Sequence, residues 1–342
     1  MSNEWSSKKR VLGLLNGEKV DRVPCFSGMG NITVPGLEKY GVAFQEVHKN
    51  AEQMANAASS SYDLYGYETA VVPFDLGVEA EAFGCDINYY EHVEGILYPT
   101  VKSKILKTGD KVSVPDDFLE RGRIPVVADA LRLLQKNWGD KIAIGTYILG
   151  PYTMAGQLMD LNDLLKNSFK QKEAVTEILE GLIPPLTALA KHYKDAGADY
   201  ITVREMGAPS DIISPRMFNS LIVPPLKKLI EGLPGPRILH MCGDTNPIIE
   251  MMQTCGAEAL SVEQRNDISA SREKLGKDAI ILGNIDAYNV LVQSKPDVIK
   301  ENVQKAIEAG VDGIMPGCDI WPEISKDNML AFVNATKEFG KV

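Results

Sequence analysis

One histidine and two cysteines occupy positions that could form a metal site. His240 and Cys242 close an apolar run, 237–242, and Cys318 follows a second apolar run, 313–316. Because side chains alternate along an extended strand, the His-x-Cys spacing places His240 and Cys242 on the same face. One imidazole and two thiolates suit Zn²⁺, and three protein ligands with an open position are typical of a catalytic zinc site. A lone buried cysteine or histidine would be read as part of the core, but three such residues at two strand ends favour a metal.

A fourth ligand and a reaction class are predicted from the same region. Glu263 closes the run 259–263, and its carboxylate could fill the fourth tetrahedral position until a substrate displaces it. The alternative is an ion pair with Arg265. Two thiolates already offset the charge of the metal, so this zinc would generate hydroxide poorly. Such a zinc ion is better suited to bind the thiol of a substrate as a third sulfur ligand, because coordination lowers the pKa of a thiol enough to deprotonate it at neutral pH. The residues therefore predict alkylation of a substrate thiol.

The composition excludes several classes of partner. The 342 residues include 46 acidic and 36 basic residues, for a net charge of −10, and no run of lysines and arginines occurs, so nucleic acid is not an expected partner. No apolar run approaches the roughly 18 residues of a membrane span, and the N-terminus lacks a signal-peptide pattern. The five cysteines are too few and scattered for a disulfide framework, which fits a reducing cytoplasm. Cys25, Cys85 and Cys255 are expected to be structural.

Short β-branched runs alternate with segments of helical period along most of the chain. The eight candidate strands are 22–26, 70–74, 142–148, 200–205, 237–242, 259–263, 280–284 and 313–316. Parallel neighbours need crossover helices, so this alternation predicts a (β/α)8 TIM barrel. We expect a single domain over 1–342, with an extended insertion, 75–140, between the second and third strands. Loops of that length are usually functional lids or additions, and a helix is predicted inside this one, from Pro125 to Trp138.

Three crossovers end in related phrases that feed the next strand. They read Ala-Gly-Ala-Asp at 196–199, Cys-Gly-Ala-Glu at 255–258 and Ala-Gly-Val-Asp at 309–312. Each phrase predicts a helix that ends at a glycine cap. The other ends of the strands must meet at the rim where barrel enzymes keep their chemistry. The polar residues collected there are Glu205, His240, Cys242, Glu263, Asn284, Cys318 and Asp319.

Taken together, the motifs resemble those of a known family. They are Leu239-His-Met-Cys-Gly-Asp-Thr-Asn-Pro-Ile-Ile249, Leu260-Ser-Val-Glu263, Leu282-Gly-Asn284 and Met315-Pro-Gly-Cys318, preceded by Lys19-Val-Asp-Arg-Val-Pro24 and Val72-Pro-Phe-Asp75. In this order they resemble the uroporphyrinogen decarboxylase superfamily, in its methylcobamide:coenzyme M methyltransferase branch, over nearly the whole chain.

The resemblance implies a (β/α)8 barrel in which His240, Cys242 and Cys318 hold zinc. The metal would activate a thiol, most simply that of coenzyme M, and the thiolate would attack a methyl group carried on the cobalt of a corrinoid. Such a methylcorrinoid is usually presented by a small separate corrinoid protein that docks on the C-terminal rim, and cobalt leaves as Co(I). Glu205 and Asn284 are predicted to line the acceptor pocket, and Asp75 to orient groups behind the ligands.

Three alternatives remain open at this stage. Decarboxylation of uroporphyrinogen is disfavoured, because Ser27-Gly-Met-Gly-Asn31 stands where the decarboxylases carry Arg-Gln-Ala-Gly-Arg, and a tetra-acidic substrate needs guanidinium partners. Tetrahydrofolate is an alternative methyl acceptor. A non-catalytic corrinoid- or metal-binding protein is the third alternative, although the chain lacks an Asp-x-His-x-x-Gly motif. Arg204-Glu-Met-Gly207 departs from the Asp-Pro of the methyltransferase branch. A homodimer is compatible with the sequence, which names neither the corrinoid protein nor the methyl source.

Overall fold

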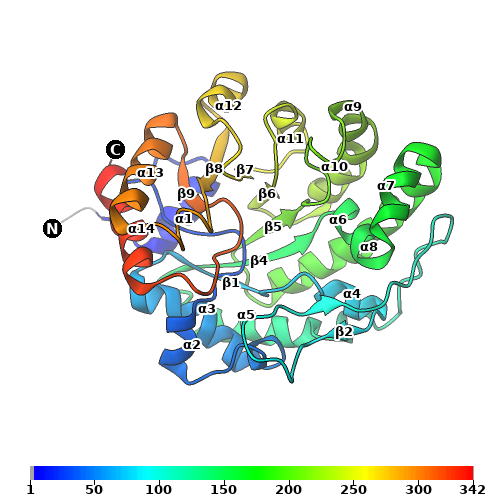
Figure 1. Cartoon of the computed structure of the whole chain (residues 1–342), viewed down its shortest axis with the longest axis horizontal. Helices are drawn as coiled ribbons and strands as arrows, with labels where there is room; N and C mark the ends of the chain where they lie inside the picture. Colours follow the sequence, from blue (N-terminus) through cyan, green and yellow to red (C-terminus); the bar gives the residue numbers. More distant parts are fainter. Residues whose placement is uncertain (1–3, 342) are drawn as a thin grey trace.

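The computed structural model describes residues 4–341, and its centre is a curled parallel sheet with helices around it (Figure 1). The sheet has seven strands, which in spatial order are β1 (Thr69–Val72), β4 (Ala143–Leu149), β5 (Tyr200–Arg204), β6 (Arg237–Met241), β7 (Ala259–Val262), β8 (Ile280–Ile285) and β9 (Gly313–Pro316). This order is also the order along the chain, so each crossover joins strands that lie side by side. The α/β barrel class predicted from the sequence is confirmed.

Helices supply the crossovers and cover the outside of the sheet. They are α1 (Ser7–Leu15), α2 (Val34–Tyr40), α3 (Ala51–Tyr65), α4 (Val78–Phe83), α5 (Ile124–Trp138), α6 (Pro151–Leu158), α7 (Leu161–Lys170), α8 (Lys172–Asp195), α9 (Pro215–Met217), α10 (Val223–Gly232), α11 (Ile249–Gln253), α12 (Ile268–Leu275), α13 (Pro296–Ala309) and α14 (Lys326–Phe339). Two short 3-10 helices, η1 (Glu46–His48) and η2 (Phe118–Glu120), and one short π-helix, η3 (Phe218–Ile222), complete the helical elements described. In the part of the chain described here, none of these helices is long and apolar enough to cross a membrane.

The first predicted strand, 22–26, is not a strand, and this prediction was wrong in detail. The segment instead makes one parallel bridge, from Cys25 to Ile314 of β9, and the Cys25 carbonyl accepts a hydrogen bond from Glu68 N at 3.0 Å beside β1. It therefore links the two edge strands at the eighth position of the barrel. Within the segment, Cys25 N donates to a side chain, Glu68 Oε1, rather than to a strand carbonyl, and Ser27 N, directly after it, donates to Thr69 Oγ1. Pro24 has no N–H at all, so a regular ladder cannot form.

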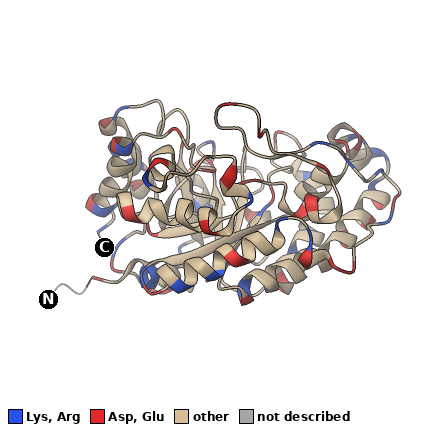
Figure 2. Ribbon diagram, turned by 90° about the horizontal axis from the view of Figure 1, so that it is seen from below, with Lys and Arg blue, Asp and Glu red and all other residues tan. Residues whose placement is uncertain are grey.

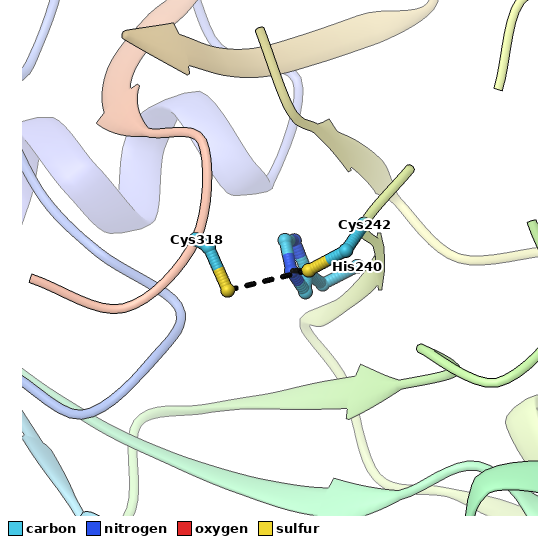
Figure 3. Close-up of side chains that lie close together, drawn as sticks. All are labelled: His240, Cys242 and Cys318. Atoms are coloured by element: carbon cyan, nitrogen blue, oxygen red, sulfur yellow. Dashed lines mark hydrogen bonds between the residues drawn. The ribbon is translucent and has the colours of Figure 1, made fainter. Parts of the chain in front are cut away.

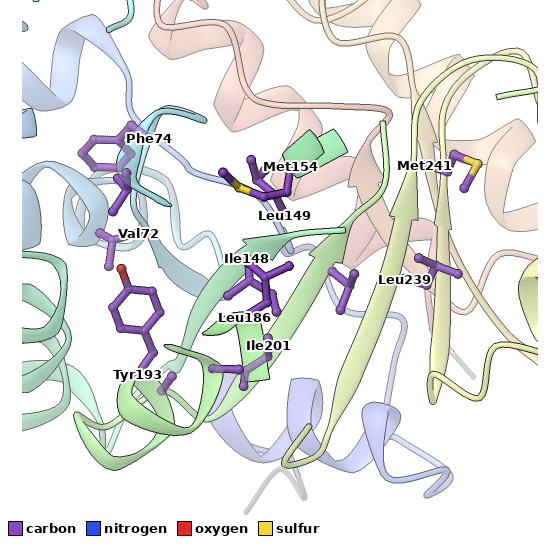
Figure 4. Packing of buried hydrophobic residues seen from close by; sticks show 14 of the residues in the cluster. Val72, Phe74, Ile148, Leu149, Met154, Leu186, Tyr193, Ile201, Leu239 and Met241 are labelled. Atoms are coloured by element: carbon purple, nitrogen blue, oxygen red, sulfur yellow. The ribbon is translucent and has the colours of Figure 1, made fainter. Parts of the chain in front are cut away.

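Apolar side chains pack on both faces of the seven-stranded sheet. Outward-facing residues such as Val72, Ile148 and Leu239 pack against the helices, including Leu186 and Tyr193 of α8 (Figure 4). The opposite face forms a separate inner cluster, which contains Tyr147, Tyr200, Ile238 and Met315 together with Val11, Leu14 and Leu15 of α1. Lys8 N donates to Lys141 O just before β4 begins, so α1 lies at the end of the barrel where the strands start.

The three related phrases form one repeated contact at that same end. Gly197 and Gly310 end α8 and α13 at positive φ, as predicted, whereas α11 ends at Gln253 with Thr254 as its cap, and Gly256, also at positive φ, comes later. The acid that closes each phrase then bonds back to the strand before it: Asp199 Oδ2 accepts from Ile144 N at 2.8 Å, Glu258 Oε2 from Arg237 N at 2.6 Å, and Asp312 Oδ2 from Ile281 N at 2.8 Å. Each carboxylate therefore ties the start of one strand to the start of its neighbour.

The insertion between β1 and β4 has structure of its own. It contains α4, the short antiparallel pair β2 (Ile87–Asn88) and β3 (Thr100–Val101), η2 and α5. The helix predicted from Pro125 to Trp138 is confirmed, because α5 covers Ile124–Trp138. The insertion follows the carboxyl end of β1, so its loops reach the same rim as the predicted metal ligands. Charged residues of both signs are scattered over the helices and loops in the view of Figure 2.

Candidate metal centre and active site

Two strands deliver the predicted metal ligands to one point. His240 is the penultimate residue of β6, Cys242 follows that strand directly, and Cys318 lies two residues after β9. The strands β7 and β8 lie between them in the sheet, so the ligands approach from two parts of the curved rim. Figure 3 shows all three side chains pointing toward one another. The prediction that these residues converge is confirmed.

The atoms that could bind a metal lie close together. His240 Nε2 is 3.2 Å from Cys242 Sγ, and Cys242 Sγ is 3.3 Å from Cys318 Sγ. All three ligand atoms fall within 4.8 Å of one another. His240 is fully buried, and its other ring nitrogen, Nδ1, lies 3.0 Å from Ser261 Oγ on β7. This contact orients the imidazole with Nε2 toward the sulfurs, as metal-bound histidines are usually held through their second nitrogen.

Glycines next to both cysteines allow the backbone to pack this tightly. Gly243 has φ +85°, and a Cβ at this position would lie 2.5 Å from Pro209 Cβ. At Gly317 a Cβ would lie 3.1 Å from the backbone of both Glu263 and Gln264. A larger residue at either position would push its neighbouring cysteine away from the cluster.

The two thiols are unequal in this arrangement. The hydrogen bond between the sulfurs, with Cys242 as donor, holds the pKa of Cys318 well below its ordinary value and raises that of Cys242. Burial raises the pKa of Cys242 further, whereas His240 and the positive charge of Arg204 help to lower the pKa of Cys318. In this arrangement Cys318 is the hydrogen-bond acceptor and Cys242 the donor.

A partly buried ion pair lies beside Cys318, with Arg204 buried and Asp319 31% exposed. Arg204, at the end of β5, donates from both Nη atoms to the carboxylate of Asp319, at 3.0 and 2.5 Å. Its guanidinium lies over the ring of Tyr147, 4.7 Å from the centroid, and its side chain is 1 % exposed. Burial raises the pKa of Asp319 although the arginine opposes this. The guanidinium of Arg204, although paired with Asp319, helps to lower the pKa of Cys318.

Two cavities open beside the cluster and share part of their walls. The smaller, of about 230 Å³, is lined by Ile96, Tyr98, Cys318, Asp319, Ile320, Trp321, Pro322 and Glu323. The larger, of about 440 Å³, is lined by twelve residues that include Asp75, Lys104, Gln157 and Arg204, and again Tyr98 and Asp319. A small acceptor molecule therefore has room next to Cys318, between the barrel rim and the insertion.

Glu263 borders the cluster but does not belong to it in this structure. Its Oε1 accepts a hydrogen bond from Arg265 Nε at 2.6 Å, which is the ion pair considered as the alternative. Its backbone packs against Gly317, one residue before Cys318. The role of Glu263 as a fourth ligand stays a prediction, and it would require the carboxylate to turn toward the sulfurs.

The predicted pocket residues Glu205 and Asn284 lie elsewhere. Glu205 is fully buried and accepts hydrogen bonds from Tyr152 N at 3.0 Å and from Thr153 N at 2.7 Å, so it anchors the start of α6. Burial raises its pKa to about 7. Asn284 donates to Asn266 O at 3.0 Å and lines a separate cavity of about 240 Å³. Neither side chain lines the cavities beside Cys318, so the predicted placement in the acceptor pocket is corrected.

Comparison with known proteins places the chain in a family. The family model described as uroporphyrinogen decarboxylase (URO-D) matches residues 6–339. The chain belongs to the uroporphyrinogen decarboxylase family. Methylcobamide:CoM methyltransferase MtaA of Methanosarcina barkeri is 34% identical over 343 residues, covering 98% of this chain and 99% of that protein. Methylcobamide:CoM methyltransferase MtbA of Methanosarcina acetivorans is 28% identical over 340 residues, with 98% and 99% covered.

A solved structure agrees with this family assignment. The structure described as a methyltransferase from Methanosarcina mazei superposes with a TM-score of 0.92 at 33% identity, covering 98% of this chain and 99% of that one. The resemblance to the methyltransferase branch inferred from the motifs is confirmed.

Asp75, which was predicted to orient groups behind the metal ligands, is held in a network of charged side chains that the sequence did not indicate. Asp75 lines the larger cavity and is held by Arg123, whose Nη1 and Nη2 donate to its two oxygens at 2.6 and 3.0 Å, and by His48 Nδ1 at 3.1 Å. Burial alone would raise the pKa of Asp75, but Arg123 and His48 hold it below its ordinary range. Arg123 also pairs with Glu81 at 2.8 Å. The network joins the end of β1 to the insertion.

The remaining cysteines do not contribute to the cluster. Cys25, Cys85 and Cys255 are buried free thiols. Burial raises the pKa of each of them, to about 12 in Cys255. They behave as the structural residues that their sequence positions predicted.

Proposed function

We propose that this chain is a zinc-dependent methyltransferase that moves a methyl group from a methylcobamide to the thiol of coenzyme M. The observation that carries the proposal is the meeting of one imidazole and two sulfurs at the barrel rim, within 4.8 Å, in a chain whose full-length relatives are named methylcobamide:CoM methyltransferases. Neither the fold nor the metal site alone would specify this reaction.

The donor set fits zinc. Zinc binds sulfur at about 2.3 Å and imidazole nitrogen at about 2.0 Å, so tetrahedral ligands of one ion are roughly 3.5 to 3.8 Å apart. The separations of 3.2 and 3.3 Å in the cluster would need to grow by only about half an ångström or less. We assign His240, Cys242 and Cys318 as the three ligands. Two thiolates and one imidazole favour zinc over magnesium or calcium, which prefer oxygen ligands.

We assign the fourth position to Glu263 when no acceptor is bound. Arg265 bonds to its Oε1, and the carboxylate would have to turn toward the sulfurs for Oε2 to reach the metal. An acceptor thiol would replace this oxygen, because a soft ion prefers sulfur. When bound, zinc would supply the acidity that deprotonates the acceptor thiol at neutral pH.

The residues around the cluster support the transfer step. The proton of the acceptor S–H leaves to solvent, and the thiolate attacks the methyl carbon of the donor. A carbon–sulfur bond forms while the cobalt–carbon bond breaks, and the electron pair of that bond stays on cobalt, which leaves as Co(I). Ser261 holds the His240 ring, and Arg204 offsets negative charge near Cys318. We further propose that the corrinoid arrives on a small separate protein that docks on this rim, as expected from the family resemblance.

The experiment measures metal content and methyl transfer together. Purified protein is loaded with zinc and mixed under anaerobic conditions with free methylcobalamin and coenzyme M. Zinc is counted by elemental analysis, cobalt is followed by its absorbance, and methylated coenzyme M is detected by mass spectrometry. We expect one zinc per chain and stoichiometric loss of methylcobalamin as the product forms. Cys318→Ala should lose both zinc and transfer, while Cys255→Ala, a buried cysteine outside the cluster, should retain both.

Three results would overturn parts of this proposal. An active protein without metal would exclude the zinc mechanism. Transfer to tetrahydrofolate but not to coenzyme M would change the acceptor. A stoichiometric zinc content with no transfer to any thiol would instead support the non-catalytic alternative.

A further inference from the structure

Two aromatic side chains stand half exposed at the rim, beside the proposed metal site. Trp321 follows β9 and is 47% exposed, and Tyr288 follows β8 and is 44% exposed. Their ring centroids are 4.9 Å apart, with 56° between the ring planes. Burying a large aromatic side chain normally stabilises the folded protein. A contiguous pair left half open to solvent offers an apolar contact surface at this rim.

The pair borders the cavity that reaches Cys318. Trp321 lines the smaller cavity, of about 230 Å³, together with Cys318, Ile320 and Pro322 from the same loop. Ile96 and Tyr98 of the insertion also line this cavity, and Leu97, between them in the sequence, is 39% exposed. The apolar surface is thus continuous from the sulfur of Cys318 out to the exposed aromatic rings.

The proposed reaction sets limits on what can rest there. A methyl group must come within about 3.5 Å of the attacking thiolate, in line with the bond that breaks. In a methylcorrinoid this methyl group projects from the face of a broad, flat macrocycle, whose faces are largely apolar. The cavity of about 230 Å³ has room for the methyl group and the acceptor, whereas the macrocycle must stay at its mouth.

We propose that Trp321 and Tyr288, with the exposed Leu97 between the cavity-lining Ile96 and Tyr98, form the surface on which the corrin macrocycle of the methyl donor rests. This inference depends on the proposed function for the identity of the donor. The aromatic faces cover the apolar face of the ring and fix its distance from Cys318. The surface binds the macrocycle itself, not the polypeptide that carries it and not a second copy of this chain.

The first test measures kinetics with free methylcobalamin, which has no carrier protein. We expect Trp321→Ala to raise the KM for methylcobalamin about tenfold or more, with a smaller rise for Tyr288→Ala, while the KM for coenzyme M and the zinc content stay unchanged. Trp321→Phe should restore most of the loss. Phe169→Ala is the matched control: Phe169 is 60% exposed on α7, across the molecule from β8 and β9 in Figure 1, and its loss should change neither KM.

The second test does not depend on turnover. The chain has three tryptophans, Trp5, Trp138 and Trp321. In the double variant Trp5→Phe/Trp138→Phe, only Trp321 remains, and its emission should be quenched in a saturable way by methylcobalamin. The variant Trp321→Phe, which keeps the other two tryptophans, should show much less quenching after correction for absorbance by the cobalamin.

The outcomes separate this inference from the proposed function. If the wild-type protein transfers no methyl group but Trp321 emission is still quenched, the proposed function fails and the corrin surface stands. If transfer occurs and Trp321→Ala leaves the KM for methylcobalamin unchanged, the inference is wrong. A change in oligomeric state of Trp321→Ala on sedimentation, with the KM unchanged, would assign the aromatic pair to a contact between chains and would also overturn the inference.

Discussion

Arg123→Met should destabilise the protein by an amount that depends on pH. The arginine and Asp75 form a bidentate pair with side chains that are 4% and 1% exposed. Methionine keeps much of the apolar length of the side chain but leaves the Asp75 carboxylate buried beside only His48 and one backbone N–H. Removing one partner of a buried ion pair lowers the free energy of unfolding by about 3 to 5 kcal/mol. We expect a loss of this size at neutral pH, measured by urea titration with reversibility checked by refolding.

The control uses an arginine of the same helix. Arg132 pairs with Asp129 on the surface of α5, where the side chains are 54% and 60% exposed. Exposed pairs contribute about 1 kcal/mol or less. Arg132→Met should therefore be nearly neutral in the same titration. Replacing both buried partners, in Arg123→Met/Asp75→Leu, should recover much of the loss, because the buried charge of Asp75 is removed and Glu81, the other partner of Arg123, is 21% exposed.

The pH dependence follows from the pKa of Asp75. In the wild-type protein this pKa lies below its ordinary value of 3.8, so the stabilisation is present above that value and is lost as the pH falls through the folded pKa. Without Arg123, burial should raise the pKa, and the variant then gains stability as Asp75 takes up a proton. The difference between the two proteins should narrow as the pH is lowered from about 7 to about 4.5. A loss below about 1 kcal/mol, or one of equal size at both pH values, would refute the reasoning.

Two further predictions concern the metal cluster. Ser261→Ala removes the contact that orients His240, so zinc affinity, measured by competition with a chromophoric chelator, should fall about 10- to 100-fold while the fold is retained; an unchanged affinity would show that the serine does not orient the ring. Glu263→Gln should weaken zinc binding when no thiol is present but not in saturating coenzyme M, because the acceptor would then occupy the fourth position. Equal affinities for the wild-type and variant proteins without thiol would remove Glu263 from the ligand set.

The metal cluster was predictable because two simple rules apply to it. Parallel strands bring their carboxyl ends to one rim, and residues two apart in a strand share a face. His240 and Cys242 satisfy both rules, and the glycine next to each cysteine marks the tight packing.

The same rules misplace residues when the strand face is not known. Glu205 ends its strand at the rim, as expected, but it is one residue beyond Arg204, and the alternation turns it outward to the start of α6. Arg204 is the residue that lines the larger cavity and pairs with Asp319. A charged residue inside an otherwise β-branched run was the available signal, because a buried arginine requires a partner.

The insertion could not be placed from the sequence at all. Tyr98, Ile96 and Arg123 approach the site from long loops and a helix start, where no strand period determines direction. The segment 22–26 was predicted as a strand because of its local apolar pattern. In the structure, side chains of Glu68 and Thr69 accept hydrogen bonds from the N–H groups of Cys25 and Ser27 instead. These partners are distant in the sequence, so the local pattern could not reveal them.

The carboxylates of Asp199, Glu258 and Asp312 separate the part of the barrel that holds its shape from the part that performs chemistry. They fasten neighbouring strands together at the end farthest from the sulfurs. The loops at the catalytic rim therefore do not have to hold the strands together. They can change in length or composition to suit another methyl donor or acceptor without destabilising the sheet.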